Sequence, residues 1–157
     1  MLKICRKYST MKGIVVDLPQ VLENTQDLLK NENEVITKRL TFHSSDFFKD
    51  ELPKGDLYIL SRILHDWKPD KIDYILKKLY QALPENGALL IAEMLLDDDK
   101  CGPLSVQLQS LNMLVQTEGK ERTFQEYKSL LSQIGFSHIQ SRLTGSYLDV
   151  ILAIKCG

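Results

Sequence analysis

One histidine in this chain stands where an α/β sheet usually delivers its chemistry. The apolar run at residues 56–61 follows a Pro-Lys-Gly turn signal and predicts a buried strand. The carboxyl ends of such strands are where ligands bind in α/β folds. His65 comes shortly after that end, and it is the only histidine in the chain with a carboxylate and an aromatic side chain, Asp66 and Trp67, directly beside it. This position predicts a functional imidazole.

An imidazole at this position suits general-base catalysis at neutral pH. The unperturbed pKa of histidine is about 6.5, whereas that of a phenolic hydroxyl is about 10. Removing the hydroxyl proton as the oxygen attacks is worth about 10²–10⁴-fold in rate. A neighbouring carboxylate would fix the imidazole tautomer, and Glu93 at the next strand end and Glu121 in a polar loop are the candidates. The alternative is that His65 only makes ordinary hydrogen bonds within a loop.

Two further strand ends carry groups that could bind a nucleotide-like cofactor. Asp17 closes the run at residues 13–16, and an acid there accepts hydrogen bonds from ribose hydroxyls in nucleotide-binding folds. The alternative is an acid that interacts with the dipole of the following helix. Asp46 and Phe47 follow the next predicted strand, where a carboxylate could accept from an adenine amino group and the ring could pack on the purine. Phe47 could equally be a core residue.

A polar pair on a later predicted helix could contact a substrate amide. Asn112 and Gln116 lie four positions apart, so they share one face of the helix. Both side chains can donate and accept hydrogen bonds. The alternative is a solvated helix face.

Strands that alternate with helices must position these residues. Apolar runs predict strands at residues 13–16, 36–43, 56–61, 88–92, 139–143 and 147–154. Helical spacing and end signals predict helices at residues 1–8, 19–30, 69–83, 104–115 and 123–134. This order predicts an α/β fold with a doubly wound, mostly parallel sheet. The last two strands could form an antiparallel hairpin, which would add one reversed strand.

Composition excludes several classes of partner. The net charge of −1 gives no electrostatic footprint for nucleic acid or anionic membrane. No apolar run is long enough to span a bilayer, and the basic N-terminus has no apolar segment typical of a secretory signal. Cys5, Cys101 and Cys156 show no C-x-x-C spacing, which predicts reduced cysteines in the cytoplasm and no disulfide framework or zinc site. The histidines are scattered, so we expect no metal.

Four stretches of the chain resemble the plant and animal family of small-molecule O-methyltransferases that use S-adenosylmethionine. They are DLPQV from Asp17, SDFFKD from Ser45, GDLYILSRILHDW from Gly55 and LNMLVQTEGKERT from Leu111. The last two are long and specific, and the resemblance covers nearly the whole chain. It implies a Rossmann-like methyltransferase fold with S-adenosylmethionine as the cofactor.

The resemblance also implies a role for each candidate residue. His65 is similar to the family's general base, and Glu93 and Glu121 match the two acids that orient it. The implied cofactor-binding residues are Asp17, Asp46, Phe47 and Arg62. The implied substrate-binding residues are Asp66, Asn112 and Gln116. The implied reaction is attack of the 5-hydroxyl oxygen of N-acetylserotonin, or of a similar hydroxyindole, on the sulfonium methyl group. No metal is implied, because the histidine supplies the base and alignment of the reactants supplies most of the catalysis.

Family members contain two parts that this sequence does not match. One is a strand with a glycine-rich loop that precedes the first helix, and the other is an N-terminal helical domain that forms homodimers. The strand is normally central, between the strands that end at Asp17 and Ser61. We therefore expect a single truncated methyltransferase domain, residues 1–157, whose sheet is incomplete on its N-terminal side. Unpaired buried backbone groups in such a sheet would cost about 1–3 kcal/mol each.

Three functions follow from these observations. The first is an O-methyltransferase of hydroxyindoles, cytoplasmic, acting on a small molecule and not on nucleic acid or membrane. The second is a truncated, inactive fragment that binds or regulates. The third, a nicotinamide-dependent oxidoreductase, is poorly supported, because its diagnostic glycine loop is absent and the HDW and QTEGKER stretches have no role in it.

Overall fold

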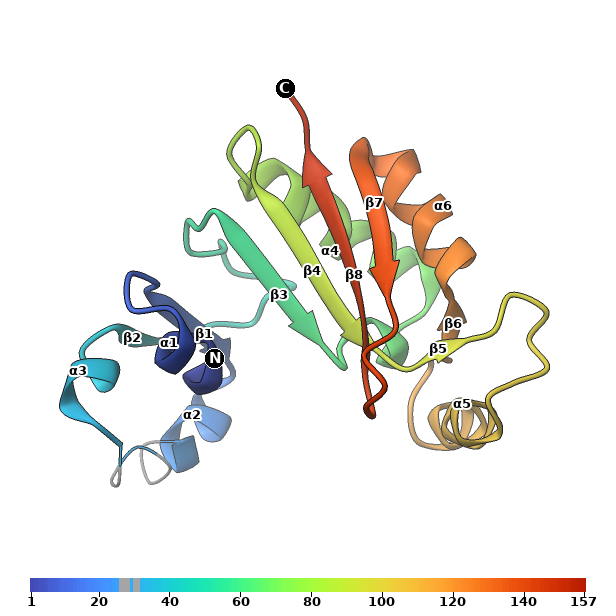
Figure 1. Cartoon of the computed structure of the whole chain (residues 1–157), viewed down its shortest axis with the longest axis horizontal. Helices are drawn as coiled ribbons and strands as arrows, with labels where there is room; N and C mark the ends of the chain where they lie inside the picture. The colour runs from blue at the N-terminus through green and yellow to red at the C-terminus, as the bar shows by residue number, and fades with distance from the viewer. Residues whose placement is uncertain (26–28, 30–31) are drawn as a thin grey trace. The chain divides into compact units, whose positions relative to one another are not determined.

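The chain folds into two compact units, Met1–Pro53 and Lys54–Gly157. They are seen in a computed structural model of the whole chain (Figure 1), which describes residues 1–25, 29 and 32–157. Each unit has its own sheet, and each is described here by itself.

The first unit is built around a parallel pair of strands. Its elements are α1 (Leu2–Lys7), β1 (Gly13–Asp17), α2 (Pro19–Thr25), α3 (Glu34–Thr37) and β2 (Leu40–Ser44). β1 and β2 pair in parallel register from Gly13 opposite Leu40 to Asp17 opposite Ser44. The pairing brings the carboxyl ends of the two strands to the same edge of this small sheet, with Ser45 N donating to the carbonyl of Asp17 at 3.0 Å.

One predicted strand of this unit is half wrong. Residues 36–43 were expected to be extended, but Ile36 and Thr37 belong to α3 and the strand begins at Leu40. The reason is that α3 begins within the weakly alternating run that predicted the strand. Asn33 caps α3 by accepting a hydrogen bond from Val35 N at 2.8 Å, and this satisfies one of the free donors of the first turn. The predicted helix from Pro19 is present to Thr25, and its positions 26–28 and 30 lie outside the described residues.

The second unit holds a four-stranded sheet in the order β3-β4-β8-β7. Its elements are β3 (Leu57–Ser61), η2 (Leu64–Asp66), α4 (Pro69–Ala82), β4 (Ala88–Glu93), β5 (Leu95–Leu96), α5 (Leu104–Gln116), β6 (Arg122–Thr123), α6 (Phe124–Ile134), β7 (Phe136–Arg142) and β8 (Asp149–Lys155). β3 and β4 are parallel, whereas β8 is antiparallel to both β4 and β7. The prediction of a mostly parallel sheet with one reversed strand is therefore confirmed.

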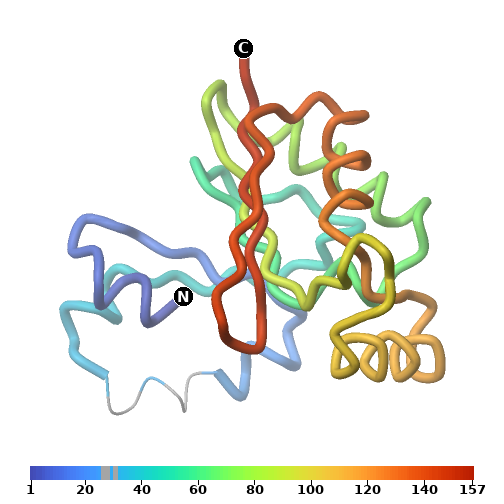
Figure 2. Tube along the Cα trace, turned by 45° about the vertical axis from the view of Figure 1, so that its right-hand side comes forward, coloured from blue at the N-terminus to red at the C-terminus, as the bar shows by residue number. Residues whose placement is uncertain are grey.

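The closing strands form the expected hairpin, and Figures 1 and 2 show the chain turning back from β7 to β8. β7 begins at Phe136, earlier than the predicted residue 139. Gly135 explains the difference, because its φ of 113° ends α6 in the left-handed conformation and turns the chain directly into the strand.

One face of this sheet carries the core. Leu89 and Ile91 of β4 are fully buried, and so is Ala153 of β8, in the alternating pattern of a strand that is covered on one side. α4 and α6 lie on that side (Figure 1). The predicted apolar stripe of α4 is confirmed by the buried residues Ile72, Ile75, Leu76 and Leu79.

Among the described strands, β1 pairs with β2 in the first unit, and β3 pairs with β4 in the second. The truncated single domain with an incomplete sheet stays a prediction. In the part of the chain that the structure describes, no helix is both long and apolar enough to cross a bilayer.

Candidate active site

The short helix η2 carries His65 directly beyond the carboxyl end of β3. Arg62 follows the strand with a left-handed φ of 55°, and its amide donates to the carbonyl of Ala92 at 3.0 Å. This turn redirects the chain into η2 instead of continuing the strand. His65 is buried there, with only 2% of its surface exposed.

Glu93, the last residue of β4, supports the start of η2. One carboxylate oxygen, Oε1, accepts hydrogen bonds from the amides of Ile63 and Leu64, both at 3.0 Å. The first amides of a helix have no partner within it, so Glu93 acts as the cap that Ile63 does not supply. The other oxygen, Oε2, lies 3.7 Å from His65 Nδ1.

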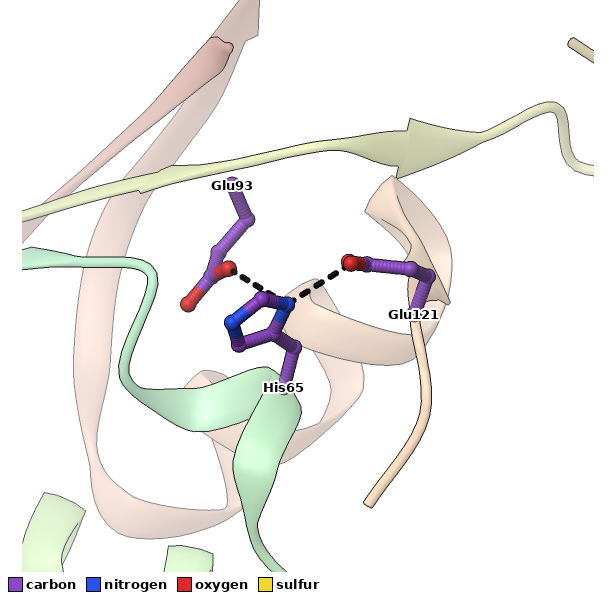
Figure 3. Close-up of side chains that lie close together, drawn as sticks. All are labelled: His65, Glu93 and Glu121. Carbon is purple, nitrogen blue, oxygen red and sulfur yellow. Dashed lines mark hydrogen bonds and ion pairs between the residues drawn. The ribbon is translucent and has the colours of Figure 1, made fainter. Parts of the chain in front are cut away.

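Glu121 makes the shortest contact with the imidazole. Its Oε1 lies 2.7 Å from His65 Nδ1, and its side chain is fully buried. Figure 3 shows the ring between the two glutamates, with both carboxylates directed toward the same nitrogen. A carboxylate can only accept, so Nδ1 carries the proton and Nε2 is left as the basic nitrogen.

A pair of very short strands brings the two acids together. β5 follows β4 almost at once, and it pairs in parallel with β6, which begins directly after Glu121. Leu95 lies opposite Arg122 in this register, so the pairing fixes Glu121 close to Glu93 although they are far apart in sequence. Thr123, at the end of β6, also caps α6 in the predicted capping box with Glu126.

Burial and charge shift the ionisation of this cluster. Burial alone would lower the pKa of His65, but the hydrogen bond that Nδ1 donates to Glu121 and the negative charges of Glu93, Glu121 and Asp66 outweigh it and raise the pKa above 6.5. Burial raises the pKa of Glu93 to about 7, and the Glu121 carboxylate adds to this shift, while His65 opposes it. Glu93 therefore titrates near neutral pH beside the imidazole, and shifted pKa values in a cluster of this kind are typical of acid–base sites.

Asp66 lies on the other side of the imidazole. Its Oδ1 is 3.5 Å from His65 Nε2, and its side chain is 37% exposed, far more than that of His65 or of either glutamate. Asp66 is thus a partly exposed acidic group beside Nε2.

The three buried side chains could in principle hold a metal ion, because one ligand atom from each lies within 4.8 Å of the others. The 2.7 Å contact from Glu121 is that of a charge-assisted hydrogen bond. Hydrogen bonding thus positions the imidazole, and the expectation of no metal stays a prediction.

The predicted cofactor residues fall in both units. In the first, Asp17 is the last residue of β1 and Asp46 comes shortly after β2, so both stand at the same edge of that sheet. Asp17 Oδ1 accepts from Leu18 N at 2.8 Å. Asp46 accepts from Phe48 N at 3.0 Å and pairs with Lys49 at 2.8 Å, and the Lys49 contact holds the pKa of this carboxyl below its usual value. Phe47 packs on Phe48, with ring centroids 4.8 Å apart.

The fourth cofactor candidate, Arg62, belongs to the second unit. Its guanidinium donates to the hydroxyl of Tyr147 at 2.5 Å and lies over that ring, 5.4 Å from the centroid. Tyr147 comes from the loop between β7 and β8, so this contact ties the end of β3 to the closing hairpin.

The predicted substrate pair shares a face of α5, as its spacing required. Gln116 Nε2 donates to Asn112 Oδ1 at 2.7 Å. Gln116 is exposed and Asn112 is half-buried. The binding roles of both residues stay predictions, as do those of all the other candidates.

Sequence reasoning missed two residues that contact η2 directly. The guanidinium of Arg122 donates to backbone carbonyls of this turn, and the backbone of Gly119 lies against the carbonyl of His65. The capping box at Thr123 placed Arg122 at the start of α6, beside Glu121, but no pattern in the residue types marked either contact.

The O-methyltransferase domain family matches residues 1–137 of the chain. The chain is 48% identical to acetylserotonin O-methyltransferase of Gallus gallus and 45% identical to that of Homo sapiens, in each case over 94% of this chain and 42% of the relative. It is also 40% identical to a probable bifunctional dTTP/UTP pyrophosphatase/methyltransferase protein of Homo sapiens, over 98% of this chain and 24% of that protein. The chain thus spans less than half the length of these relatives.

Solved structures show the same fold. Human N-acetylserotonin methyltransferase in complex with S-adenosylmethionine superposes with a TM-score of 0.90 at 44% identity, covering 98% of this chain and 43% of that one. An O-methyltransferase family 2 protein from Planctomyces limnophilus, in complex with apigenin, gives a TM-score of 0.91 at 32% identity, covering 98% of this chain and 45% of that one.

Proposed function

We propose, from the premise that the chain belongs to the O-methyltransferase domain family, that its site transfers a methyl group to a hydroxyindole. The proposed donor is S-adenosylmethionine, and the proposed acceptor is the 5-hydroxyl group of N-acetylserotonin or a similar compound, which would give melatonin or its analogue. Similarity to acetylserotonin O-methyltransferases supports this substrate, and the geometry of the site supports the chemistry.

The observation that carries the proposal is the 2.7 Å contact between His65 Nδ1 and Glu121. It leaves Nε2 free of a proton and ready to take one from a phenolic hydroxyl. Bound S-adenosylmethionine would supply an electrophilic methyl group on a positively charged sulfur. As the hydroxyl oxygen forms its bond to that carbon, His65 accepts the hydroxyl proton, and the carbon–sulfur electron pair leaves with the sulfur.

The two glutamates would stabilise His65 as it becomes charged. Glu121 remains an acceptor throughout and offsets the positive charge that forms on the ring. Glu93 holds the turn through two amides and adds negative charge 3.7 Å from Nδ1. The acids thus favour the protonated ring, which is the state that exists after the proton has moved.

The first unit presents donor-binding chemistry of the kind the cofactor needs. The Asp17 and Asp46 carboxylates at the shared edge of β1 and β2 suit ribose hydroxyls and an adenine amino group, and Phe47 beside them offers an aromatic face. Arg62 is proposed to contact the cofactor as well. The proposed acceptor contacts are Asp66, next to Nε2, and the amides of Asn112 and Gln116.

A second candidate function is a chain that binds but does not turn over. The observation that favours it is the burial of His65, of which only 2% is exposed. A base must reach its substrate, so this burial requires η2 or its neighbours to move before reaction.

Calorimetry and a methyl-transfer assay on the purified chain distinguish the two. We expect binding of S-adenosylmethionine and formation of an O-methylated indole from N-acetylserotonin. His65→Asn should lower the turnover number about 10²–10⁴-fold and leave the affinity for the cofactor unchanged, because the base does not hold the donor. His138→Asn is the matched control, since His138 is exposed on β7 and Asn tolerates its left-handed φ of 48°. An unchanged turnover number in His65→Asn would refute the assigned base, and cofactor binding without any turnover would favour the second candidate.

Residence in the cytoplasm and a homodimeric state are further proposals. The first rests on three cysteines without a disulfide spacing, and the second on the family resemblance. Fractionation and light scattering on the natural protein would test them.

A further inference from the structure

We propose that Arg122 is a positioning residue for His65, which acts by holding the backbone carbonyls of η2. The inference rests on the proposed role of His65 as the base. In this proposal Arg122 fixes the position of the imidazole, and Gly119 allows the loop that contains it to lie close to η2.

The helix η2 needs support from outside because it is very short. It comprises Leu64–Asp66, and its N-cap residue Ile63 makes no side-chain hydrogen bond to it. A single 3₁₀ turn has poor hydrogen-bond geometry and fixes many backbone angles for few bonds. The position of His65 therefore depends on the side chains that form hydrogen bonds with the backbone of this turn.

Charged side chains form hydrogen bonds with the backbone of η2 at both ends. At its start, Glu93 accepts from the amides of Ile63 and Leu64. At its end, Arg122 Nη1 donates to the carbonyl of Leu64 at 3.2 Å and Nη2 donates to the carbonyl of Trp67 at 3.1 Å. The amide end of a helical turn is partially positive and its carbonyl end partially negative. The negative charge of Glu93 at the first end and the positive charge of Arg122 at the second therefore both stabilise the turn.

Arg122 is anchored well enough to transmit this position. It is buried, with 4% of its surface exposed, and Nη1 also donates to the carbonyl of Lys120 at 3.0 Å. Its backbone is fixed in β6 opposite Leu95. The planar guanidinium reaches two carbonyls of the turn and one of its own loop at once, a geometry that a lysine ammonium cannot reproduce.

Gly119 lets this loop lie directly against the turn. A Cβ atom at this position would stand 1.9 Å from the carbonyl oxygen of His65, which is far inside van der Waals contact. Only glycine permits the approach. Glu121 and Arg122 follow in the same loop, so one segment binds the ring of His65 and the backbone that carries it.

Solution NMR of the whole chain tests the proposal without needing turnover. In the unaltered chain we expect a downfield Nδ1 proton of His65, shared with Glu121, and a pKa of His65 above its ordinary value. Arg122→Lys should abolish the downfield signal, lower the pKa of His65, and speed hydrogen exchange of the Trp67 amide roughly tenfold. Gly119→Ala should do the same by pushing the loop away. Where turnover is measured, the turnover number should fall and KM should change little.

Matched controls are Arg142→Lys, which alters an exposed arginine on β7, and Gly55→Ala, whose Cβ would meet only the Leu57 carbonyl at 3.8 Å. Both should leave the His65 signal and pKa unchanged. A folded Arg122→Lys chain with an unaltered His65 titration would overturn the proposal. Global unfolding of this variant would also contradict it, because Arg122 would then support the unit as a whole and not the turn. Lack of turnover in the unaltered chain, with the NMR result as expected, would contradict only the proposed function.

Discussion

Glu121 shows how one carboxylate can decide what an imidazole does. It fixes the proton on Nδ1, and its charge favours the protonated ring. Two of the buried carboxylate oxygens at the site, Oε2 of Glu93 and Oε2 of Glu121, have no hydrogen-bond partner among the residues that the structure describes. Unsatisfied acceptors of this kind cost stability, so the site holds its negative charge at the expense of the fold.

Replacing Glu121 by Gln should therefore weaken the base without changing its surroundings in size. We expect the turnover number to fall by about 10²-fold or more, because the amide no longer stabilises the imidazolium. The pKa of His65 should fall as well, since one of the interactions that raise it is lost. Steady-state kinetics and NMR titration measure the two effects. Glu118→Gln in the same loop is the control, since Glu118 pairs with Lys71 at 2.7 Å and should leave both quantities unchanged.

The parts of the site differed in how far the sequence could predict them. The position of His65 beyond a strand was predictable because an apolar run and a turn signal mark β3. Its partners Glu93 and Glu121 were candidates because one ends the next strand and the other lies in a polar loop, and the family resemblance matched both, but their distances to the ring could come only from the structure. Arg122 and Gly119 were not foreseen, because a guanidinium that binds carbonyls and a close backbone approach leave no pattern in the residue types.

At the scale of elements, length decided which ones were predictable. α4 and α6 carry several helical turns of apolar spacing, and α6 has both a capping box and a terminal glycine. In contrast, β5 and β6 have two residues each, which is too short for any alternation to show. α3 was missed because its four residues overlap a weakly alternating run.

The start of α6 offers a prediction at this scale. Thr123→Ala removes the side chain that accepts from Glu126 N, and it should lower the free energy of unfolding by about 1 kcal/mol. Urea unfolding followed by circular dichroism measures the change. Ser132→Ala, on an exposed position of the same helix, should cost nothing, since alanine is the better helix former. Equal losses in the two variants would contradict the capping role.

Across the whole molecule, the free energy of unfolding should decrease both when the pH rises and when it falls. The pKa of Glu93 is raised from 4.5 to about 7, so the folded chain keeps a proton that the unfolded chain has released between these values. Stability from this group is full below pH 4.5 and is lost as pH rises toward 7. His65 acts in the same direction, because its raised pKa gives stability that is present below pH 6.5 and is lost above it.

Glu126 acts in the opposite direction at low pH. Burial opposes the shift, but the hydrogen bond from Thr123 N and the Lys100 and Lys120 ammonium groups lower its pKa to about 2. Its contribution is present above pH 4.5 and is lost as pH falls toward 2.

The thermal midpoint should therefore be highest near pH 5 and fall on both sides. Differential scanning calorimetry from pH 3 to pH 8, roughly the range over which these groups titrate, measures this profile. Glu93→Gln should flatten the decline of the thermal midpoint above pH 5. A pKa shift of the size seen for Glu93 corresponds to about 3 kcal/mol of unfolding free energy. Glu51→Gln, at an exposed carboxyl, should leave the profile unchanged. A midpoint that rises from pH 5 to pH 8 would contradict the assigned shifts.

The three residues from Glu121 to Thr123 join the site to the beginning of a helix, and heat should reveal that link. Helix ends open at lower temperature than the body of a protein, because they are held by fewer contacts. When the first turn of α6 loosens, β6 shifts and the imidazole loses its partner, while the sheet is still intact. The proposed methyl transfer should then fail several degrees below the temperature at which the chain melts.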